Sequence, residues 1–455
     1  MTKDLYGLET TASRPETLQA INDFIHGFLS YQPKAAGIIA AADTDLDCPL
    51  VNAYAALLWM FLEHPIAPSK ARPYLERANA SKVANAREQE VIRVVGHWVE
   101  GDVPALLAAC DTLTDQWPRD LAMLKLAQYH LFNTGDAAGM LRLALKSVPE
   151  AEDIAYTHGM IAFGYEQCHL LDRAEAAARR AMELRHDEPW AHHAMAHVML
   201  TQGRVAEGAR FMESVAETWS DLNSFMRSHN WWHLALFYLS QGRHDDVRAA
   251  YDQHIWGLEK DYSQDQVGAV SLLARMEFAG IDVGDRWSDV ADHVAARGQD
   301  TVSPFLTLQY LYALCRTERP EAAEMLTAIE ARAAETNAYD HAAWAEVALP
   351  AARGIAAHAE GDWSTAIREL GIALPRMAEC GGSHAQRDLF EQIHLDALVR
   401  DGRASAAQQV LEMRRTYDPD GVPLNLMLSE VYEKTGLPDL AAQARARAER
   451  TLAST

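Results

Sequence analysis

The stretch HLLDRAEAAARRAMELRHDEPWA, residues 169–191, shows the repeating unit of this chain. A turn at His169 is followed five residues later by a small side chain, Ala174, and then by a helix. The same unit recurs at three consecutive intervals of 34 residues, with turns at Gly101, Gly135, His169 and Gly203. It continues at slightly longer intervals and closes on another interval of 34, with turns at Gly242, Gly280, Thr317, Gly361, Gly402 and Gly436. Such a period indicates stacked supersecondary units that share one continuous core.

The small residue after each turn lets the second helix of a unit approach the first closely. It stands five positions after the turn at Ala174, Gly208, Ala366, Ala407 and Ala441. The clearest first helix is WWHLALFYLSQG, residues 231–242, with Trp231, Leu234 and Tyr238 at the spacing W-x2-L-x3-Y. These features resemble the tetratricopeptide repeat, a helical hairpin of about 34 residues that buries its apolar face only by stacking on its neighbours.

This resemblance implies an all-α chain that forms a right-handed α/α superhelix, a solenoid of about ten helical hairpins. We expect residues 1–80 to hold N-terminal helices and an irregular first repeat, and residues 81–455 to form one continuous repeat superhelix. No apolar run approaches the ~20 residues that span a bilayer, and the N-terminus lacks the regions of a signal peptide. We therefore expect no membrane partner and a cytoplasmic location. The five cysteines lie far apart, which predicts reduced and mostly buried thiols.

The chain is acidic, with 64 Asp and Glu residues against 41 Lys and Arg residues and a formal net charge of −23. Nucleic-acid binding depends on Lys and Arg side chains that displace counterions, so we expect no nucleic-acid partner. The charges of both signs are interspersed along the helices, as is typical of a solvated outer surface. The expected partners are a small molecule or a peptide, and assembly into a homo-oligomer stays open.

Four motifs resemble one narrower group of repeat proteins. They are, in chain order, HNWWHLALF (229–237), YDQHI (251–255), SLLARMEFAGIDVGDRW (271–287) and GGSHAQRDLF (381–390). Together they resemble the tetratricopeptide repeat protein 38-like family over most of the chain. One departure is TLQYLYAL (307–314), which carries Gln309 where a histidine is expected. The resemblance implies the repeat fold and no particular reaction.

The position of each histidine within its repeat predicts which face of the helix its side chain occupies. Residues about thirteen, ten, nine, six and three places before a turn face the concave groove of such repeats. His193 and His197 precede Gly203 at two of these offsets, and His229, Trp232 and His233 precede Gly242 at three of them. His158 and His192 fall at the offset of a buried packing residue. We therefore expect the first five side chains to share one cavity.

Two functions fit a groove lined by histidine and tryptophan. The first is the binding of a compact ligand or peptide. Its expected binding residues are Tyr156, Glu166, His193, His197, His229, Trp232, His233 and Arg387. The alternative is an acid-base or hydrolytic enzyme that uses His193, His197, His229 and His233, with or without assistance from a metal ion. The i,i+4 pairs suit metal ligation, but neither belongs to an H-E-x-x-H motif, so no metal or cofactor is predicted.

The segment GGSHAQRDLF is a second candidate site. Gly381 and Gly382 permit a bend, and Ser383 with Gln386 forms an S-x-x-Q capping box at the start of a new helix. In the first turn of that helix, Arg387 could hold an anionic group of the ligand with its two-pronged guanidinium. The structural alternative is that Arg387 braces the bend by pairing with Asp388 or another acid.

Overall fold

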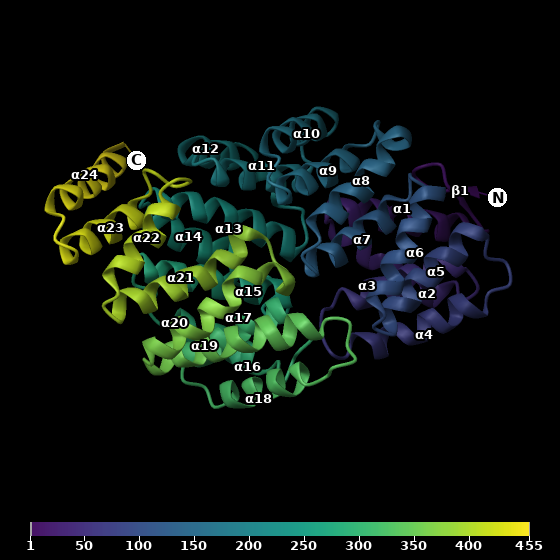
Figure 1. The fold of residues 1–455 in the computed structure, drawn as a ribbon. Helices are drawn as coiled ribbons and strands as arrows, with labels where there is room; N and C mark the ends of the chain where they lie inside the picture. Colours follow the sequence, from purple (N-terminus) through teal and green to yellow (C-terminus); the bar gives the residue numbers. More distant parts are fainter. Residues whose placement is uncertain (1, 455) are drawn as a thin grey trace. The chain divides into compact units, whose positions relative to one another are not determined.

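The computed structural model describes residues 2–454, and almost all of its regular structure is α-helical (Figure 1). The predicted all-α architecture of helical hairpins is confirmed, with 24 α-helices among the described residues. The strands of the described chain are β1 (Thr2–Lys3) and β2 (Glu9–Thr10), an antiparallel pair in which Thr2 lies opposite Thr10. The chain divides into two compact units, residues 2–194 with Trp219–Met226, and Met195–Thr218 with residues 227–454.

The first unit is a series of helical hairpins. Its helices are α1 (Pro15–Ser30), α2 (Gly37–Thr44), α3 (Pro49–Met60), α4 (Ala67–Ala80), α5 (Ala86–Val99), α6 (Val103–Gln116), α7 (Leu121–Asn133), α8 (Ala137–Ala151), α9 (Ala155–Gln167) and α10 (Leu171–Leu184). The 3-10 helix η1 (Pro33–Ala36) belongs to this unit, and η2 (Ala216–Trp219) lies where the chain passes from the second unit back to the first. A single hydrophobic cluster that reaches from Ala12 to Phe163 forms the core of this unit.

The second unit continues the same pattern. The division falls inside α11 (Pro189–Thr201) and near the start of α13 (Ser224–Ser240). The further helices are α12 (Val205–Val215), α14 (His244–Ala250), α15 (Ser263–Phe278), α16 (Arg286–Ala295), α17 (Pro304–Arg316), α18 (Glu321–Ala333), α19 (Leu349–Glu360), α20 (Trp363–Ala373), α21 (His384–Arg400), α22 (Ala404–Arg414), α23 (Val422–Lys434) and α24 (Pro438–Ser454). Tyr251–Ile255 and Ala343–Ala348 are π-helical, and Leu374–Cys380 is a 3-10 helix.

Each repeat turn ends its first helix in the same way. A residue with positive φ follows the helix, and the next backbone N–H bonds back to the last helical turn, as Arg204 N does to Met199 O at 2.9 Å. This is the Schellman ending, which favours glycine. The positive-φ residues are Gly101, Gly135, His169, Gly203, Gly242, Gly280, Glu318, Gly361, Gly402 and Gly436. The turn predicted at Thr317 therefore lies one residue later, because Thr317 is still the C-cap of α17.

The small residues after the turns lie where two helices meet. Ala174, Ala366 and Ala407 have 0% exposure. A Cβ atom added at Gly208 would collide with the ring of Phe237 on α13. Gly208 therefore lets α12 approach α13, the first helix of the next hairpin, and a close approach between the two helices of one hairpin stays a prediction.

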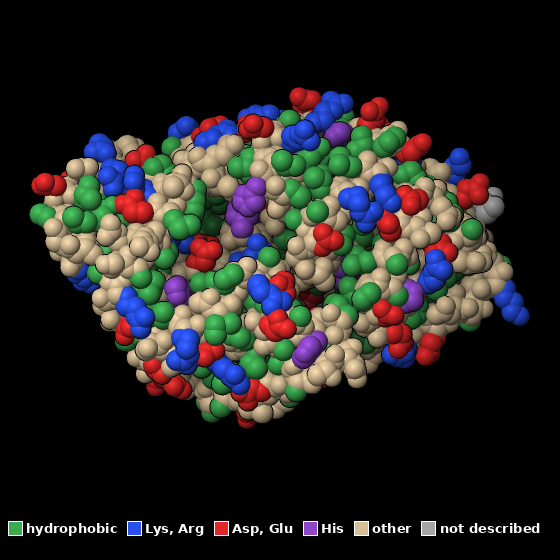
Figure 2. Space-filling view, viewed as in Figure 1, with side chains coloured by type: hydrophobic (Ala, Val, Ile, Leu, Met, Phe, Trp, Pro, Cys, Tyr) green, Lys and Arg blue, Asp and Glu red, His purple; other side chains and the backbone are tan. Residues whose placement is uncertain are grey.

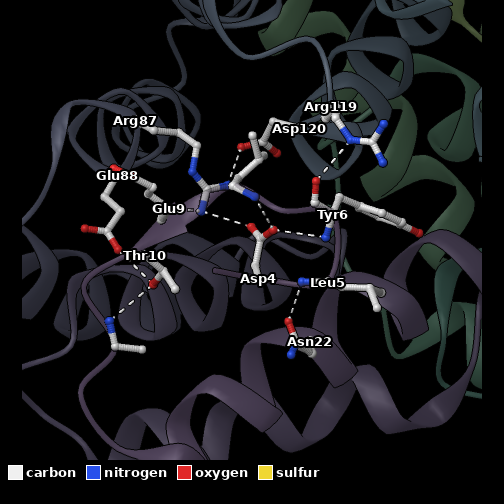
Figure 3. A network of polar contacts seen from close by, with 12 residues as sticks. Asp4, Leu5, Tyr6, Glu9, Thr10, Asn22, Arg87, Glu88, Arg119 and Asp120 are labelled. Atoms are coloured by element: carbon white, nitrogen blue, oxygen red, sulfur yellow. Dashed lines mark hydrogen bonds and ion pairs between the residues drawn. The ribbon is translucent and has the colours of Figure 1, made fainter. Parts of the chain in front are cut away.

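The N-terminal segment of the first unit is fastened by a buried polar network, which we call the N-terminal strap (Figure 3). The Arg87 guanidinium lies 3.1 Å from Asp4 Oδ2 and 2.9 Å from Asp120 Oδ2. Glu88 accepts hydrogen bonds from the hydroxyls of Thr10 and Thr11, at 3.1 Å and 2.8 Å. Because these contacts join residues 4–11 to α5 and to the start of α7, they fix the N-terminal segment on the hairpins.

The surface has the mixed character expected from the sequence. Acidic and basic side chains are interspersed over the face seen in Figure 2. Among the helices of residues 2–454, none has both the length and the apolar character required to cross a bilayer. All five cysteines are free thiols, and Cys48, Cys110 and Cys380 are buried, which confirms the prediction of unbridged cysteines.

Candidate functional site

Four imidazoles and an indole of the second unit, carried by α11, α13 and α21, lie together. We call this group the histidine cluster, and its members are His197, His229, Trp232, His233 and His384. The ring centroid of His233 lies 4.5 Å from that of His197, 4.8 Å from that of His229 and 4.8 Å from that of Trp232. His229 stacks on Trp232 at 5.5 Å and 6°. The structure thus brings four sequence-predicted residues together with His384.

The cluster is buried although its side chains are polar. His197 and His233 have 0% exposure, Trp232 has 1% and His229 has 9%. Burial lowers the pKa of His229 to about 3, and His197 adds to that shift. His229 is therefore neutral at pH 7, a form in which one ring nitrogen donates a hydrogen bond and the other accepts one.

The Gly-Gly bend places His384 at the first position of α21. Gly381 and Gly382 have φ of +88° and +76°, and a Cβ atom at Gly382 would lie 2.6 Å from the Phe305 ring. The predicted capping box is confirmed, because Ser383 Oγ accepts from Gln386 N at 3.3 Å and Gln386 Oε1 accepts from Ser383 N at 2.9 Å. Only glycine suits the bend, and the capping box then determines where α21 begins.

The start of α21 is also held by ion pairs around the buried Arg275, which we call the arginine clamp. Arg275 of α15 donates to the backbone oxygen of Ala385 at 2.7 Å, and its guanidinium lies 3.7 Å from Asp388 Oδ2. Arg414 forms the second ion pair with Asp388. Burial alone would raise the pKa of Asp388, but the Arg414 and Arg275 guanidiniums lower it to about 2. The clamp holds the helix that carries His384 against α15.

Arg275 connects the clamp to the cluster. Its guanidinium lies over the Trp232 ring at 5.3 Å from the centroid and also donates to Ser271 Oγ. Trp232 Nε1 is buried and has no hydrogen-bond partner among the described residues. An unsatisfied buried donor costs about 1–3 kcal/mol, which makes this indole N–H a point where an acceptor would be stabilised.

Three of the predicted binding residues belong to the first unit. Tyr156 on α9 is 5% exposed, and its hydroxyl lies 3.4 Å from His26 Nε2. Glu166 is fully buried and accepts a hydrogen bond from Gln167 Nε2 at 2.5 Å. His193 stacks on Trp190 with centroids 4.3 Å apart. A single cavity lined by all eight predicted residues stays a prediction.

Arg387 lies in the first turn of α21, the helix that begins with His384 of the histidine cluster. Its guanidinium donates to the backbone oxygen of Gly382, so it contacts the Gly-Gly bend. The acid named as its alternative partner, Asp388, forms ion pairs with Arg275 and Arg414. Contact between Arg387 and an anionic ligand group stays a prediction.

The histidines expected to serve in packing lie in the first unit. His192 is fully buried, accepts from Trp219 Nε1 at 3.2 Å and lies 2.8 Å from the His186 backbone oxygen. Burial lowers its pKa to about 4. His158 is half-buried, with Nε2 2.9 Å from the Glu152 oxygen. Each of these imidazoles thus has a hydrogen-bond partner inside the protein, as a histidine that serves in packing requires.

Sequence reasoning missed His384, Arg275 and Asp388. The signal for His384 was its place directly after the Gly-Gly-Ser start of a helix in the motif GGSHAQRD. Its neighbour His197 lies 187 residues earlier in the chain. No local pattern predicts a contact across that separation, and the same holds for the pairing of Arg275 with Asp388.

The comparisons with known proteins concern the fold alone. No protein-family model matches the chain. A monomeric mutant of IFIT1 with Gppp-AAAA aligns over 96% of this chain and 99% of its own, with TM-score 0.42 and 10% identity. The human IFIT1 dimer with PPP-AAAA aligns over 95% and 99%, with TM-score 0.42 and 11% identity. The helices of the described residues agree with the broad resemblance to helical-repeat proteins. The narrower resemblance to the tetratricopeptide repeat protein 38-like family receives no support, since no family model matches.

One expectation about partners is corrected by these comparisons. The sequence led us to exclude nucleic acid because of the net charge of −23. The IFIT1 structures are complexes with Gppp-AAAA, PPP-AAAA and m7Gppp-AAAA, which contradicts that exclusion. The physical reason is that a net charge averages over the whole chain, whereas nucleic-acid binding depends on the local arrangement of charged groups.

Proposed function

We propose that the chain is a binding protein whose second unit takes a compact polar ligand at the histidine cluster. The observation that carries this proposal is the buried Trp232 Nε1, a donor with no acceptor among the described residues, inside a group of imidazoles. Buried polar groups are normally satisfied, and an unsatisfied one calls for an explanation such as a bound water, ion or ligand. An acceptor atom of a ligand would complete this hydrogen bond.

The ligand would meet several further polar groups. A neutral imidazole offers one donor and one acceptor, so the cluster suits a small molecule with groups of both kinds. Arg275 lies over the Trp232 ring and thereby restricts its orientation. The fold thus fixes the direction of the indole N–H before a ligand binds. Less conformational entropy of this side chain is then lost on binding.

The alternative acid-base function has weaker support. A general acid or base works best when its pKa lies near the operating pH. Burial lowers the pKa of His229 to about 3, so this imidazole is a weak base at pH 7. This favours a binding role for His229 over proton transfer. Cytoplasmic location, homo-oligomer formation and the division at residue 80 stay proposals.

The test compares two neighbouring tryptophans on α13. Trp232→Phe removes the indole N–H and keeps an aromatic ring, whereas Trp231→Phe makes the same change at a half-buried ring stacked on His254. We would screen small carboxylates, inorganic phosphate, short peptides and PPP-AAAA by thermal shift in buffer with EDTA, then titrate the best compound calorimetrically. Trp232→Phe should weaken its binding about tenfold, the value of one hydrogen bond, and Trp231→Phe should not.

Two results would count against the proposal. One is a screen in which no compound changes the melting temperature. The other is equal binding by wild type, Trp231→Phe and Trp232→Phe, because the indole N–H would then contribute nothing to recognition.

A further inference from the structure

Two members of the histidine cluster approach each other through their ring nitrogens. His197 Nδ1 lies 3.3 Å from His384 Nε2, the ring centroids are 5.1 Å apart and the ring planes meet at 74°. These side chains come from α11 and α21. Both belong to the second unit, so this contact is part of one compact body.

The spacing of the two nitrogens can be compared with two kinds of contact. Two imidazoles bound to one tetrahedral zinc ion at about 2.0–2.1 Å place their ligand nitrogens about 3.3–3.4 Å apart. A well-formed hydrogen bond from a ring N–H is shorter, about 2.9–3.0 Å. The observed distance lies at the long end of the hydrogen-bond range and also matches the spacing of two ligands of one metal ion.

The fold holds both rings in place before any ion arrives. His197 is fully buried within α11, and its backbone oxygen accepts from Thr201 Oγ1 at 2.8 Å. His384 is the first residue of a capped helix whose start is held by Arg275. Metal sites depend on such support, because an unsupported ligand loses conformational freedom on binding.

A third imidazole is available within the same unit. His233 is fully buried, and its ring centroid lies 4.5 Å from that of His197. Catalytic zinc sites usually have three protein ligands and one open position. The pair needs at least one further ligand, and His233 is an imidazole of the same unit that packs against His197.

We propose that His197 and His384 are ligands of a divalent transition-metal ion of the zinc class, with His233 as the adjacent third imidazole. Nitrogen ligands favour such ions over Mg²⁺ and Ca²⁺, which prefer oxygen. The inference rests on the proposed function and deepens it, since the ion would add a contact to a ligand that also binds without it. The competing explanation is a simple hydrogen bond in which His384 Nε2–H donates to His197.

The experiment measures the metal directly. The full chain, purified without a histidine tag, is stripped with EDTA, dialysed against Zn²⁺ or Mg²⁺, freed of excess ion and analysed by mass spectrometry for metal content. Wild type should retain about one Zn²⁺ per chain and no Mg²⁺. His197→Gln and His384→Gln should each lower the retained Zn²⁺ at least tenfold. Glutamine can replace the hydrogen bond but is a poor ligand for zinc.

The matched control is His186→Gln, which removes an imidazole from an exposed position of the first unit. It should retain as much Zn²⁺ as wild type. Equal Zn²⁺ in all four proteins, or none in wild type, would overturn the proposal and leave the hydrogen bond as the explanation. Circular dichroism checks that each variant is folded. If His197→Gln is misfolded, the Zn²⁺ content of His384→Gln gives the answer, because His384 is only half-buried.

This result is separable from the proposed function. Binding of a screened compound in EDTA, without retained Zn²⁺, would keep the binding function and reject the metal site. Retained Zn²⁺ without any bound compound would keep the metal site and reject the compact organic ligand.

Discussion

The N-terminal strap and the histidine cluster are both buried polar networks, but the free-energy cost of burying their polar groups is offset in different ways. In the strap, Arg87 lies between two carboxylates, those of Asp4 and Asp120, so opposite charges face each other. In the cluster, the polar groups are imidazoles, and burial makes His229 neutral at pH 7. Paired ions join distant segments of a fold, whereas neutral donors and acceptors in a group suit a ligand.

The contrast separates a structural network from a candidate binding site. Loss of one partner from the strap leaves an uncompensated buried charge, which is among the most destabilising changes in a protein. The five members of the cluster include no carboxylate, so loss of one imidazole separates no ion pair within it. The following experiments examine this difference, from the largest expected effect to the smallest.

Arg87→Met should destabilise the chain by about 3–5 kcal/mol, because Asp4 and Asp120 would remain buried without their counter-ion. The measurement is urea unfolding followed by circular dichroism. The control is Arg72→Met, which removes the exposed ion pair with Glu100 and should cost less than about 1 kcal/mol. Equal losses in the two variants would mean that the strap is no more important than a surface pair.

Gly382→Ala should cost about 2–4 kcal/mol. A side chain at φ +76° is strained, and its Cβ atom would lie 2.6 Å from the Phe305 ring. The bend that places His384 would shift, so ligand and Zn²⁺ binding should fall with stability. Gly402→Ala is the control, since φ there is +73° and nothing lies within 4 Å of the added Cβ. If both variants unfold alike, the contact with Phe305 is unimportant.

The neutral state of His229 should appear in the pH dependence of stability. In the native chain its pKa is about 3, whereas an unfolded histidine takes up a proton near pH 6.5. The unfolded state therefore binds more protons below pH 6.5, and the unfolding free energy falls as the pH falls from about 7 towards about 3. At pH 5 this group accounts for about 2 kcal/mol.

Denaturation of wild type and His229→Gln at pH 5 and pH 8 measures this contribution. The variant should lose less stability between the two values than wild type, by about 2 kcal/mol. His186→Gln, at an exposed position, should follow wild type. Parallel curves for wild type and His229→Gln would show that His229 is protonated normally in the native chain.

Ser383→Ala should have the smallest effect, about 1 kcal/mol, because it removes one cap hydrogen bond from α21. Ser383→Asp should restore most of the loss, since aspartate also caps helices. The quantity measured is the unfolding free energy in urea. If Ser383→Asp is as unstable as Ser383→Ala, the side chain has a role other than capping.

The sequence predicted the fold well because local chemistry determines it. Turn glycines, small residues after them and the capping box at Ser383 are each visible within a few residues. The turn placed at Thr317 was wrong by one residue, because Glu318 adopts the positive φ there without being glycine. Such a residue leaves no compositional signal, so only the spacing could suggest the turn.

The candidate site was predictable only in part. The repeat register selected His197, His229, Trp232 and His233, which the structure brings together with short centroid distances. His384 joins them from a helix 187 residues away, and Arg275 reaches α21 across a separation of 110 residues. These contacts depend on the stacking of many hairpins, which the spacing of single motifs does not encode.

The most direct test of the central claim is the unfolding free energy of His233→Leu. Leucine has a similar volume and removes the polar atoms of a fully buried imidazole. If the cluster serves binding, stability should change by no more than about 1 kcal/mol, while binding of Zn²⁺ and of the best screened compound is lost. A loss of about 3 kcal/mol or more, comparable to the expected effect of Arg87→Met, with binding intact would show instead that the cluster holds the fold together.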